Sequence, residues 1–416
     1  MRRDFVAIGP HCVLLAACML VGACASNGET PSLPQLIAAA ARSLAGLPPD
    51  HPDHYAEPVR VSDLHVFTAI TAGDEHTCAL DIDGNAYCWG SSRFRQFGDA
   101  ALPETCGRGT FACSSVPVRV ENAPRFTALA ASMWSTCGLD DSGRAHCWGY
   151  GYGAPPADGS AAASGVPVEI PGGHRFVALD SNPAGQHTCG LTAEGQVWCW
   201  RLESPVGGGP LVFVGPYPLA ASAPFVAIDV GGSHGCGIDA ARNVHCWGAN
   251  QFGQLGTGVS GFDGGISESP AAVPVRGGIA AELIASASNY SCALDAEGSL
   301  HCWGAGFPQG SYRRVPDRRS LGGYGALPVT LWTTDPKWVG LGAGTLETCG
   351  LSAGGELFCF MAAPTARESR PRRVARDHAF VAFALGKGFA CAIGSDRLAY
   401  CWGANTAGQV GRPPQG

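Results

Sequence analysis

One short pattern of apolar and polar positions recurs along most of the chain. Residues 78–90 read Cys-Ala-Leu-Asp-Ile-Asp-Gly-Asn-Ala-Tyr-Cys-Trp-Gly, and residues 292–304 read Cys-Ala-Leu-Asp-Ala-Glu-Gly-Ser-Leu-His-Cys-Trp-Gly. In both, two apolar segments flank a turn that contains an acidic residue and Gly, which is typical of a β-hairpin. The pattern therefore predicts a hairpin with one cysteine in each strand.

This hairpin occurs seven times, always with nine residues between its two cysteines, while the spacing between successive hairpins varies from 42 to 59 residues. Opposed residues of an antiparallel pair have Cα atoms about 4.5 Å apart when they are not hydrogen-bonded, and a disulfide accepts that separation. Zinc fits the spacing less well, because zinc ligands occur as Cys pairs about two to four residues apart. We expect the disulfides Cys78–Cys88, Cys137–Cys147, Cys189–Cys199, Cys236–Cys246, Cys292–Cys302, Cys349–Cys359 and Cys391–Cys401.

Two further strands precede each hairpin. An aromatic residue lies eleven positions before the first cysteine in five units and thirteen before it in the third unit: Phe67, Phe126, Phe176, Phe225, Trp338 and Phe380. A Pro, in most units followed by Val, lies another seven to ten residues upstream: Pro58, Pro117, Pro167, Pro218, Pro274, Pro328 and Pro371. Each unit then holds four strands, and four antiparallel strands make one blade of a β-propeller. The sequence predicts an all-β, seven-bladed propeller over residues 58–412, with one disulfide hairpin per blade.

The ends of the repeat region favour closure into a ring. Segments similar to Gly408–Gly411 elsewhere lead into a Pro-Val strand, whereas this one ends the last unit, and Pro58–Val59 has no unit before it. Joining the two ends would remove the exposed edges of the first and last sheets.

The repeat resembles that of the regulator of chromosome condensation family, whose members are seven-bladed propellers. The matching segments are Ala72–Leu80, of the form Ala-Gly-x-x-His-Thr-Cys-Ala-Leu, and Trp247–Gly256 and Trp402–Gly411, of the form Trp-Gly-x-Asn-x-x-Gly-Gln-Leu-Gly or close to it. Units three and six depart, since Arg201 and Met361 replace the Gly after the aromatic residue. We expect irregular connections there.

The N-terminal segment is typical of an export signal. Arg2 and Arg3 precede an apolar run, Val13–Ala23, that is too short to span a membrane as a helix. Residues 21–24, Val-Gly-Ala-Cys, resemble the lipobox of bacterial lipoproteins, in which the cysteine is lipidated; an ordinary cleaved signal peptide is the alternative.

This resemblance sets the expected domain boundaries and location. We expect a signal peptide at 1–23, lipidation of Cys24, a tether at 24–57 and a C-terminal tail at 413–416. Ala25 follows the cysteine, which resembles Gram-negative lipoproteins of the outer membrane or cell surface. The lipid anchor is then the expected attachment to the membrane, and we expect a monomer.

Composition narrows the possible functions. The net charge of −7 provides no basic surface, so nucleic acid is not an expected partner. Of the 19 cysteines, fourteen lie in the hairpins and three in the signal region. The remaining two, Cys106 and Cys113, form an eighth candidate disulfide in the connection after the first hairpin. This pairing leaves no free thiol for nucleophilic catalysis.

The histidines are candidates for ligand contact. His146, His245 and His301 occupy the position before the second cysteine that Tyr87, Trp198, Phe358 and Tyr400 occupy in other units, so we interpret them as packing residues. His76, His187 and His234 lie two residues before the first cysteine, where a ring of differing side chains would line a shared face or the channel. Turn hydrogen bonds are the alternative role for these three.

Acidic residues also recur in register, three positions after the first cysteine, at Asp81, Asp140, Asp239 and Asp295. Repetition at a hairpin turn indicates side-chain to backbone hydrogen bonds and not a catalytic acid–base pair. The features that break the repeat are the segments after the Trp-Gly pairs, at 91–116, 150–166, 202–217, 257–273 and 305–327. Variable loops on a rigid scaffold commonly carry recognition.

We therefore expect a non-catalytic lipoprotein of the cell envelope that binds a protein or glycan through loops on one propeller face, with no cofactor and no metal. The alternative is an envelope hydrolase or lyase whose site lies in the central channel. A carboxylate or His cluster that is not repeated from blade to blade, and that converges on the channel, would favour the enzyme.

Overall fold

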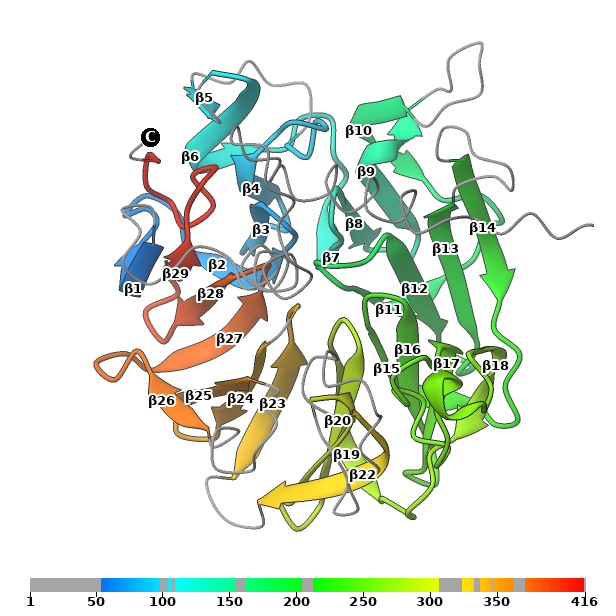
Figure 1. Ribbon diagram of the computed structural model, residues 1–416. Helices are drawn as coiled ribbons and strands as arrows, with labels where there is room; N and C mark the ends of the chain where they lie inside the picture. Colours follow the sequence, from blue (N-terminus) through cyan, green and yellow to red (C-terminus); the bar gives the residue numbers. More distant parts are fainter. Residues whose placement is uncertain are drawn as a thin grey trace, which may run out of the picture.

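The computed structural model describes residues 54–97, 104–106, 109–153, 162–203, 212–306, 324–332, 337–345, 347–361 and 371–414. Seven sheets stand around a central axis (Figure 1), which confirms the all-β, seven-bladed propeller. The expected signal peptide, Cys24 and nearly all of the tether lie outside the described residues. Among the described residues, no helix is long and apolar enough to cross a membrane.

Each blade consists of antiparallel strands, and the first strand of a blade lies innermost. The first blade contains β2 (Phe67–Ala72), β3 (His76–Asp81), β4 (Ala86–Ser91) and β6 (Phe111–Arg119), with β5 (Glu104–Cys106) added at its edge. The second contains β7 (Phe126–Ala131), β8 (Ser135–Asp140), β9 (Ala145–Gly153) and β10 (Ala162–Glu169). The third contains β11 (Phe176–Ser181), β12 (His187–Thr192), β13 (Val197–Glu203) and β14 (Val212–Pro218).

The remaining blades follow the same order. The fourth contains β15 (Phe225–Val230), β16 (His234–Asp239), β17 (Val244–Ala249) and β18 (Glu268–Pro274), and a 3-10 turn, η1 (Gly261–Asp263), precedes β18. The fifth contains β19 (Ala281–Ser286), β20 (Tyr290–Asp295), β21 (Leu300–Ala305) and β22 (Tyr324–Trp332). The sixth contains β23 (Trp338–Ala343), β24 (Glu347–Ser352), β25 (Leu357–Met361) and β26 (Arg372–Val374). The seventh contains β27 (Phe380–Leu385), β28 (Phe389–Gly394), β29 (Ala399–Ala404) and β1 (His54–Arg60).

The blade is offset by one strand from the unit read in the sequence. Each strand that contains one of these prolines, or in blade six follows Pro371, pairs with the preceding hairpin, so it is the outer strand of the preceding blade and not the first strand of its own. The offset explains closure, because β1 pairs with β29 through Val59 opposite Cys401 and Arg60 opposite Tyr400. One N-terminal strand therefore completes the last blade, and the two ends of the propeller meet.

The hairpin cysteines stand directly opposite each other in all seven blades, as the register of Cys78 with Cys88 illustrates. Their Cα atoms lie 4.0–4.1 Å apart, close to the spacing of a non-hydrogen-bonded pair, and every pair is joined by a disulfide. The expected one disulfide hairpin per blade is confirmed. Because each disulfide connects neighbouring strands of one blade, the disulfides do not tie one blade to the next.

Contacts between blades come instead from buried tryptophans and from three loops, which we call the Gln loops and which carry Gln96, Gln254 and Gln409. The backbone carbonyl of each Gln accepts a hydrogen bond from the indole Nε1 of the next blade, from Trp148 at 2.7 Å, Trp303 at 2.8 Å and Trp89 at 2.9 Å respectively. The Gln side chain folds back and accepts from the backbone N–H two residues earlier, which fixes the loop.

An apolar residue follows each of these Gln residues and fills the space beside the tryptophan. Phe97, Leu255 and Val410 are fully buried and belong to the same core clusters as Trp148, Trp303 and Trp89. The segment Trp-Gly-x-Asn-x-x-Gly-Gln-apolar at 247–255 and 402–410, and its variant with Ser92 and Arg95 at the Asn and second Gly positions, thus seal one blade against the next.

Blades three and six differ from this arrangement. Arg201 extends the pairing of β13 with β14, and its guanidinium donates to the hydroxyl of Tyr217 at 2.8 Å and to Glu203 at 3.0 Å. In blade six the outer strand β26 has only three residues. The connections themselves, at 204–211 and 362–370, lie outside the described residues.

Candidate functional site

Strand direction assigns the connections of the propeller to two faces. Because neighbouring strands are antiparallel, the turns between first and second strands emerge at the same end as the connections after the third strands. We call this end the loop face. The turns inside the cysteine hairpins and the links between blades emerge at the opposite end, which we call the hairpin-turn face. Strands extend into the expected loops, as β6 covers 111–116 and β9 reaches Gly153, so the variable segments are shorter than the sequence suggests.

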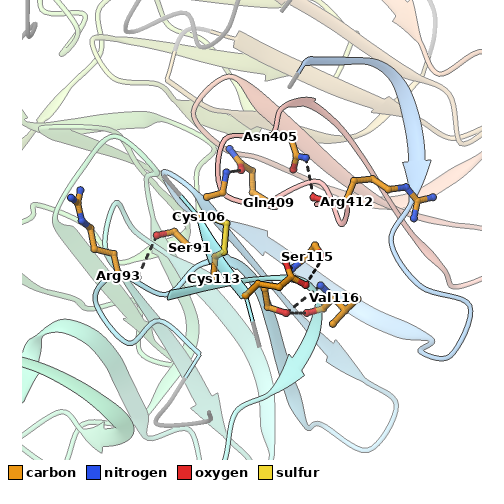
Figure 2. The surroundings of a disulfide bond; sticks show 12 residues. Ser91, Arg93, Cys106, Cys113, Ser115, Val116, Asn405, Gln409 and Arg412 are labelled. Atoms are coloured by element: carbon orange, nitrogen blue, oxygen red, sulfur yellow. Dashed lines mark hydrogen bonds between the residues drawn. A yellow bond between two sulfur atoms is a disulfide. The ribbon is translucent and has the colours of Figure 1, made fainter. Parts of the chain in front are cut away.

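On the loop face, the Cys106–Cys113 disulfide closes a small hairpin of β5 and β6. Glu104 accepts hydrogen bonds from the backbone N–H and hydroxyl of Ser115, at 3.1 and 2.7 Å, which hold β5 in place. Figure 2 shows the disulfide near Ser91 and near the C-terminal segment that carries Asn405, Gln409 and Arg412. A Cβ added at Gly408 would lie 3.2 Å from the carbonyl oxygen of Ser114, so the two segments are packed closely. This hairpin is a fixed projection on the seam between the first and last blades.

Three half-buried aromatic side chains form a second feature of the loop face. Phe94 follows β4, Trp134 lies in the turn before β8, and Tyr150 lies in the outer half of β9. Their ring centroids are 5.3 Å apart for Phe94 and Trp134, 5.1 Å for Phe94 and Tyr150, and 5.5 Å for Trp134 and Tyr150. We call this group the aromatic cluster. Beside it, the Arg93 guanidinium lies 5.4 Å from the centre of the Phe111 ring. Aromatic and arginine side chains of this kind dominate binding energy at protein interfaces.

His76 and His234, two of the candidate ligand histidines, lie between blades. Nε2 of His76 bonds to the hydroxyl of Thr136 at 2.9 Å, and Nε2 of His234 bonds to that of Ser291 at 2.8 Å. Both rings are buried, and burial lowers the pKa of His76 to about 4 and that of His234 to about 3. The geometry gives these two neutral rings a role in joining blades.

His187, the third candidate, has no such partner because Gly235 stands where the next blade would supply a hydroxyl. Burial, followed by the nearby Arg201 guanidinium, lowers the pKa of His187 to about 4. It is half-buried, so it retains some exposed surface at the loop face.

The histidines interpreted as packing residues lie near the hairpin-turn face. Nε2 of His146, His245 and His301 bonds to the carboxylate of Asp140, Asp239 and Asp295 at 2.9, 3.1 and 2.8 Å. The same carboxylates accept from backbone N–H groups of the turn, as Asp140 does from Ser142 and Arg144. Burial opposes ionisation of Asp140, but hydrogen bonds from Ser142, His146 and the turn backbone outweigh it and lower its pKa. These acids are turn-forming residues, as their repetition suggested.

The central channel holds two acidic residues that the sequence reasoning did not single out. Asp180 and Asp229 are the fifth residues of β11 and β15, and they line a cavity of about 410 Å³ together with the innermost strands of several other blades. Burial raises the pKa of both carboxyls, and the Asp180 charge raises that of Asp229 further. A comparison of inner strands would have found them, since the other five blades have Thr71, Ala130, Ala285, Gly342 and Ala384 at this position.

Each channel carboxylate already has one structural contact. Asp180 accepts a hydrogen bond from the backbone N–H of Val230, and Asp229 accepts from that of Ser286, each in the following blade. Thr71 makes the equivalent bond to Ala131 at 2.9 Å. One oxygen of each carboxylate thus joins inner strands.

One set of potential metal-binding side chains lies close together within the described part of the chain: Glu347, Cys349 and Cys359. The two sulfurs form the disulfide of blade six, so they are not available as thiolate ligands.

Comparison with known proteins supports the repeat assignment. A profile of the regulator of chromosome condensation (RCC1) repeat matches residues 67–96 and 225–254, and both stretches end within a Gln loop. The mitochondrial RCC1 domain-containing protein RUG3 of Arabidopsis thaliana is 29% identical over 151 residues, which are 34% of this chain and 31% of RUG3. The match therefore covers about a third of that relative.

Solved structures share the architecture. The yeast RCC1 protein Prp20, in its complex with Kap60, superposes with a TM-score of 0.61 at 18% identity, covering 82% of this chain and 80% of Prp20. Human WBSCR16 superposes with a TM-score of 0.58 at 14% identity, covering 79% of this chain and 90% of WBSCR16. At sequence identities this low, the superpositions show that the fold is shared. The matches show two regulator of chromosome condensation (RCC1) repeats, at 67–96 and 225–254, within a chain whose fold is a seven-bladed propeller shared with these structures.

Proposed function

We propose that this protein is a non-catalytic binding lipoprotein of the cell envelope, anchored through Cys24 at the outer membrane or cell surface. It presents the loop face of its propeller to a protein or glycan partner. The main support is the aromatic cluster, because its three side chains come from two adjacent blades and share one half-buried surface on the loop face. The disulfide-fixed β5–β6 hairpin adds a rigid projection on the same face.

A protein partner agrees with what is known of similar folds. Yeast Prp20 has been crystallised with Kap60, and its binding to Gsp1p and histones has been described. Those partners belong to that protein. The disulfides in every blade favour an oxidising compartment for this one.

Affinity capture from envelope extracts tests the loop face. Deleting whole loops would remove strand β6 or a Gln loop, so single substitutions are the better tool. Trp134→Ala truncates the aromatic cluster, and Trp198→Ala is the matched control, since Trp198 is also half-buried but stacks on His174 at the hairpin-turn face, with ring centroids 3.8 Å apart. We expect Trp134→Ala to lose the captured partner and Trp198→Ala to keep it. Equal capture by both variants would contradict recognition by this cluster.

The anchor has its own test. Metabolic labelling with a radioactive fatty acid should mark the wild-type chain and fail to mark Cys24→Ala, which should move to the soluble fraction. Labelling that persists in Cys24→Ala would contradict lipidation at Cys24.

An envelope hydrolase or lyase is the second candidate, and the Asp180–Asp229 pair is the observation that favours it. The two acids are not repeated around the ring, line the channel, and have raised pKa values that suit a proton-transferring group. Their hydrogen bonds to Val230 and Ser286 favour the structural role instead. Release of soluble fragments from purified cell-wall glycan by the wild type, and not by Asp180→Asn, would establish the enzyme.

A further inference from the structure

A projecting loop of blade four carries an exposed apolar surface on the loop face. The loop connects β17 to β18 over residues 250–267, all of which the structure describes. Its exposed apolar side chains are Val259 (44% exposed), Phe262 (61%) and Ile266 (48%). We call residues 259–266 the tip. Asp263 is the only charged residue of this loop, and its carboxylate accepts a hydrogen bond from the Ser260 hydroxyl at 2.7 Å.

The side chain of Asn250 gives the tip a fixed shape. Asn250 is fully buried, and its amide nitrogen donates to the backbone carbonyls of Val259 and Ile266, both at 3.0 Å. These two bonds hold the ends of the tip together, and the turn η1 lies between them. The Phe262 ring rests against Phe252, with ring centroids 5.3 Å apart. The exposed apolar side chains are therefore presented by a well-packed loop.

The chain enters the propeller at the same face. β1 is the outer strand of blade seven, and its first residue, His54, lies opposite Ala404, the last residue of β29. The third strand of every blade ends at the loop face, so His54 lies there too. With the lipid on Cys24, only residues 24–53 separate the membrane anchor from this face. A short linker of this kind raises the effective concentration of the loop face at the bilayer.

The tip and the entry point of the chain lie on nearly opposite sides of the ring. Blade four lies three blades before blade seven in a ring of seven (Figure 1). Two membrane contacts placed in this way would hold the whole loop face parallel to the bilayer. The hairpin-turn face also has exposed apolar side chains, Leu64 and Ile82, but they lie at the other end of the strands from His54.

We propose that the loop face lies against the membrane that holds the anchor, with the tip of blade four inserted at the boundary between lipid headgroups and acyl chains. Apolar side chains on a segment of low charge bind this boundary, because insertion removes apolar surface from water. This inference rests on the proposed anchor. It also narrows the proposed binding role, since a partner of the aromatic cluster is then a molecule at the same membrane surface.

Quenching of tryptophan fluorescence by brominated lipid tests this orientation. The protein is the mature chain, residues 24–416, with an N-terminal histidine tag that attaches it to vesicles of phosphatidylcholine and a nickel-chelating lipid. Phe262→Trp places a reporter in the tip. Compared with the wild type, the added emission should move to shorter wavelength on vesicles. It should fall about twofold with brominated chains, because interfacial apolar side chains reach roughly 5–10 Å into the acyl boundary.

Ile82→Trp is the matched control, because Ile82 is also exposed but lies in a turn of the hairpin-turn face. Its added emission should be the same with and without brominated lipid. Val259→Trp should be quenched, and adding Phe262→Asp to it should abolish the quenching, because a charged side chain opposes burial in lipid. The tag replaces the lipid, so these results test the tip itself. Loss of the fatty-acid label would instead contradict the proposed anchor.

Three results would overturn the membrane-facing orientation. The first is the same quenching, or none, in Phe262→Trp and Ile82→Trp. The second is quenching of Ile82→Trp alone, which would place the hairpin-turn face on the membrane. The third is a Phe262→Trp emission that is already at short wavelength in the free protein, because the tip would then be covered by the protein itself.

Discussion

His76 should make the stability of the propeller depend on pH, and His76→Gln should remove the part of that dependence that His76 contributes. The His76 ring is 0% exposed and bonds through Nε2 to Thr136 across the interface of blades one and two. Burial lowers its pKa from 6.5 to about 4, so the folded protein keeps this ring neutral where the unfolded chain would protonate it.

The sign and size of this pH dependence follow from the difference in proton binding between the folded and the unfolded chain. The unfolded chain takes up a proton on His76 as the pH falls below 6.5, and the folded protein does so only near 4. Stability is therefore complete above pH 6.5 and decreases as the pH falls toward 4. At 1.36 kcal/mol for each pH unit, the total loss from this residue is about 3 kcal/mol.

The assay is urea unfolding with the disulfides intact, at pH values from 7.5 to 4.5. Glutamine carries no charge and can still bond to Thr136, so His76→Gln should have a flatter pH profile and a higher stability than the wild type at pH 4.5. Tyr290→Phe is the matched control, because it removes the equivalent bond to Thr348 without changing a group that titrates in this range. It should lower stability by about 1 kcal/mol at every pH. Parallel profiles for His76→Gln and the wild type would refute the reasoning.

Three further predictions concern a hairpin disulfide, a buried glycine and the acidic pair in the channel. Replacing the Cys292–Cys302 disulfide by two alanines should lower the free energy of unfolding by about 3 kcal/mol, from the entropy of the eleven-residue loop, as a shift in the urea midpoint would show. Gly73→Ala should destabilise by roughly 2 kcal/mol or more, because its Cβ would lie 2.2 Å from Cε1 of His76. Asp180→Asn should stabilise the protein at pH 8, where the wild-type carboxylates repel each other, and less so as the pH falls toward 3.8, because a raised pKa means that stability is lost as pH rises.

Controls exist for each of these changes. Gly354→Ala should be nearly neutral in thermal unfolding, since its Cβ would meet only the Ser352 hydroxyl at 3.7 Å. Loss of the Cys106–Cys113 disulfide should speed proteolysis near β5 with a smaller change in global unfolding. An Asp180→Asn variant that unfolds more easily than the wild type at pH 8 would show that the hydrogen bond to Val230 needs a charged acceptor.

The parts of the fold that the sequence revealed are those decided by neighbouring residues. Nine residues between Cys78 and Cys88 determine both a tight hairpin and the opposed position of the sulfurs, because strand pairing and turn formation are local. The turn role of Asp140 was visible for the same reason, since its partners Ser142 and Arg144 lie within four residues. Ring closure was also indicated locally, because the first Pro-Val strand has no hairpin before it with which to pair.

Only the tertiary structure decided what meets across blades, because those contacts join residues about fifty positions apart or at opposite ends of the chain. No local pattern indicated that His76 bonds to Thr136, or that the Gln409 carbonyl accepts a hydrogen bond from the Trp89 indole. The Asp180–Asp229 pair belongs to this class, since it arises where the inner strands of adjacent blades differ from the others. A repeat sequence thus specifies its blade through local pairing, whereas its candidate binding sites depend on how one blade packs against the next.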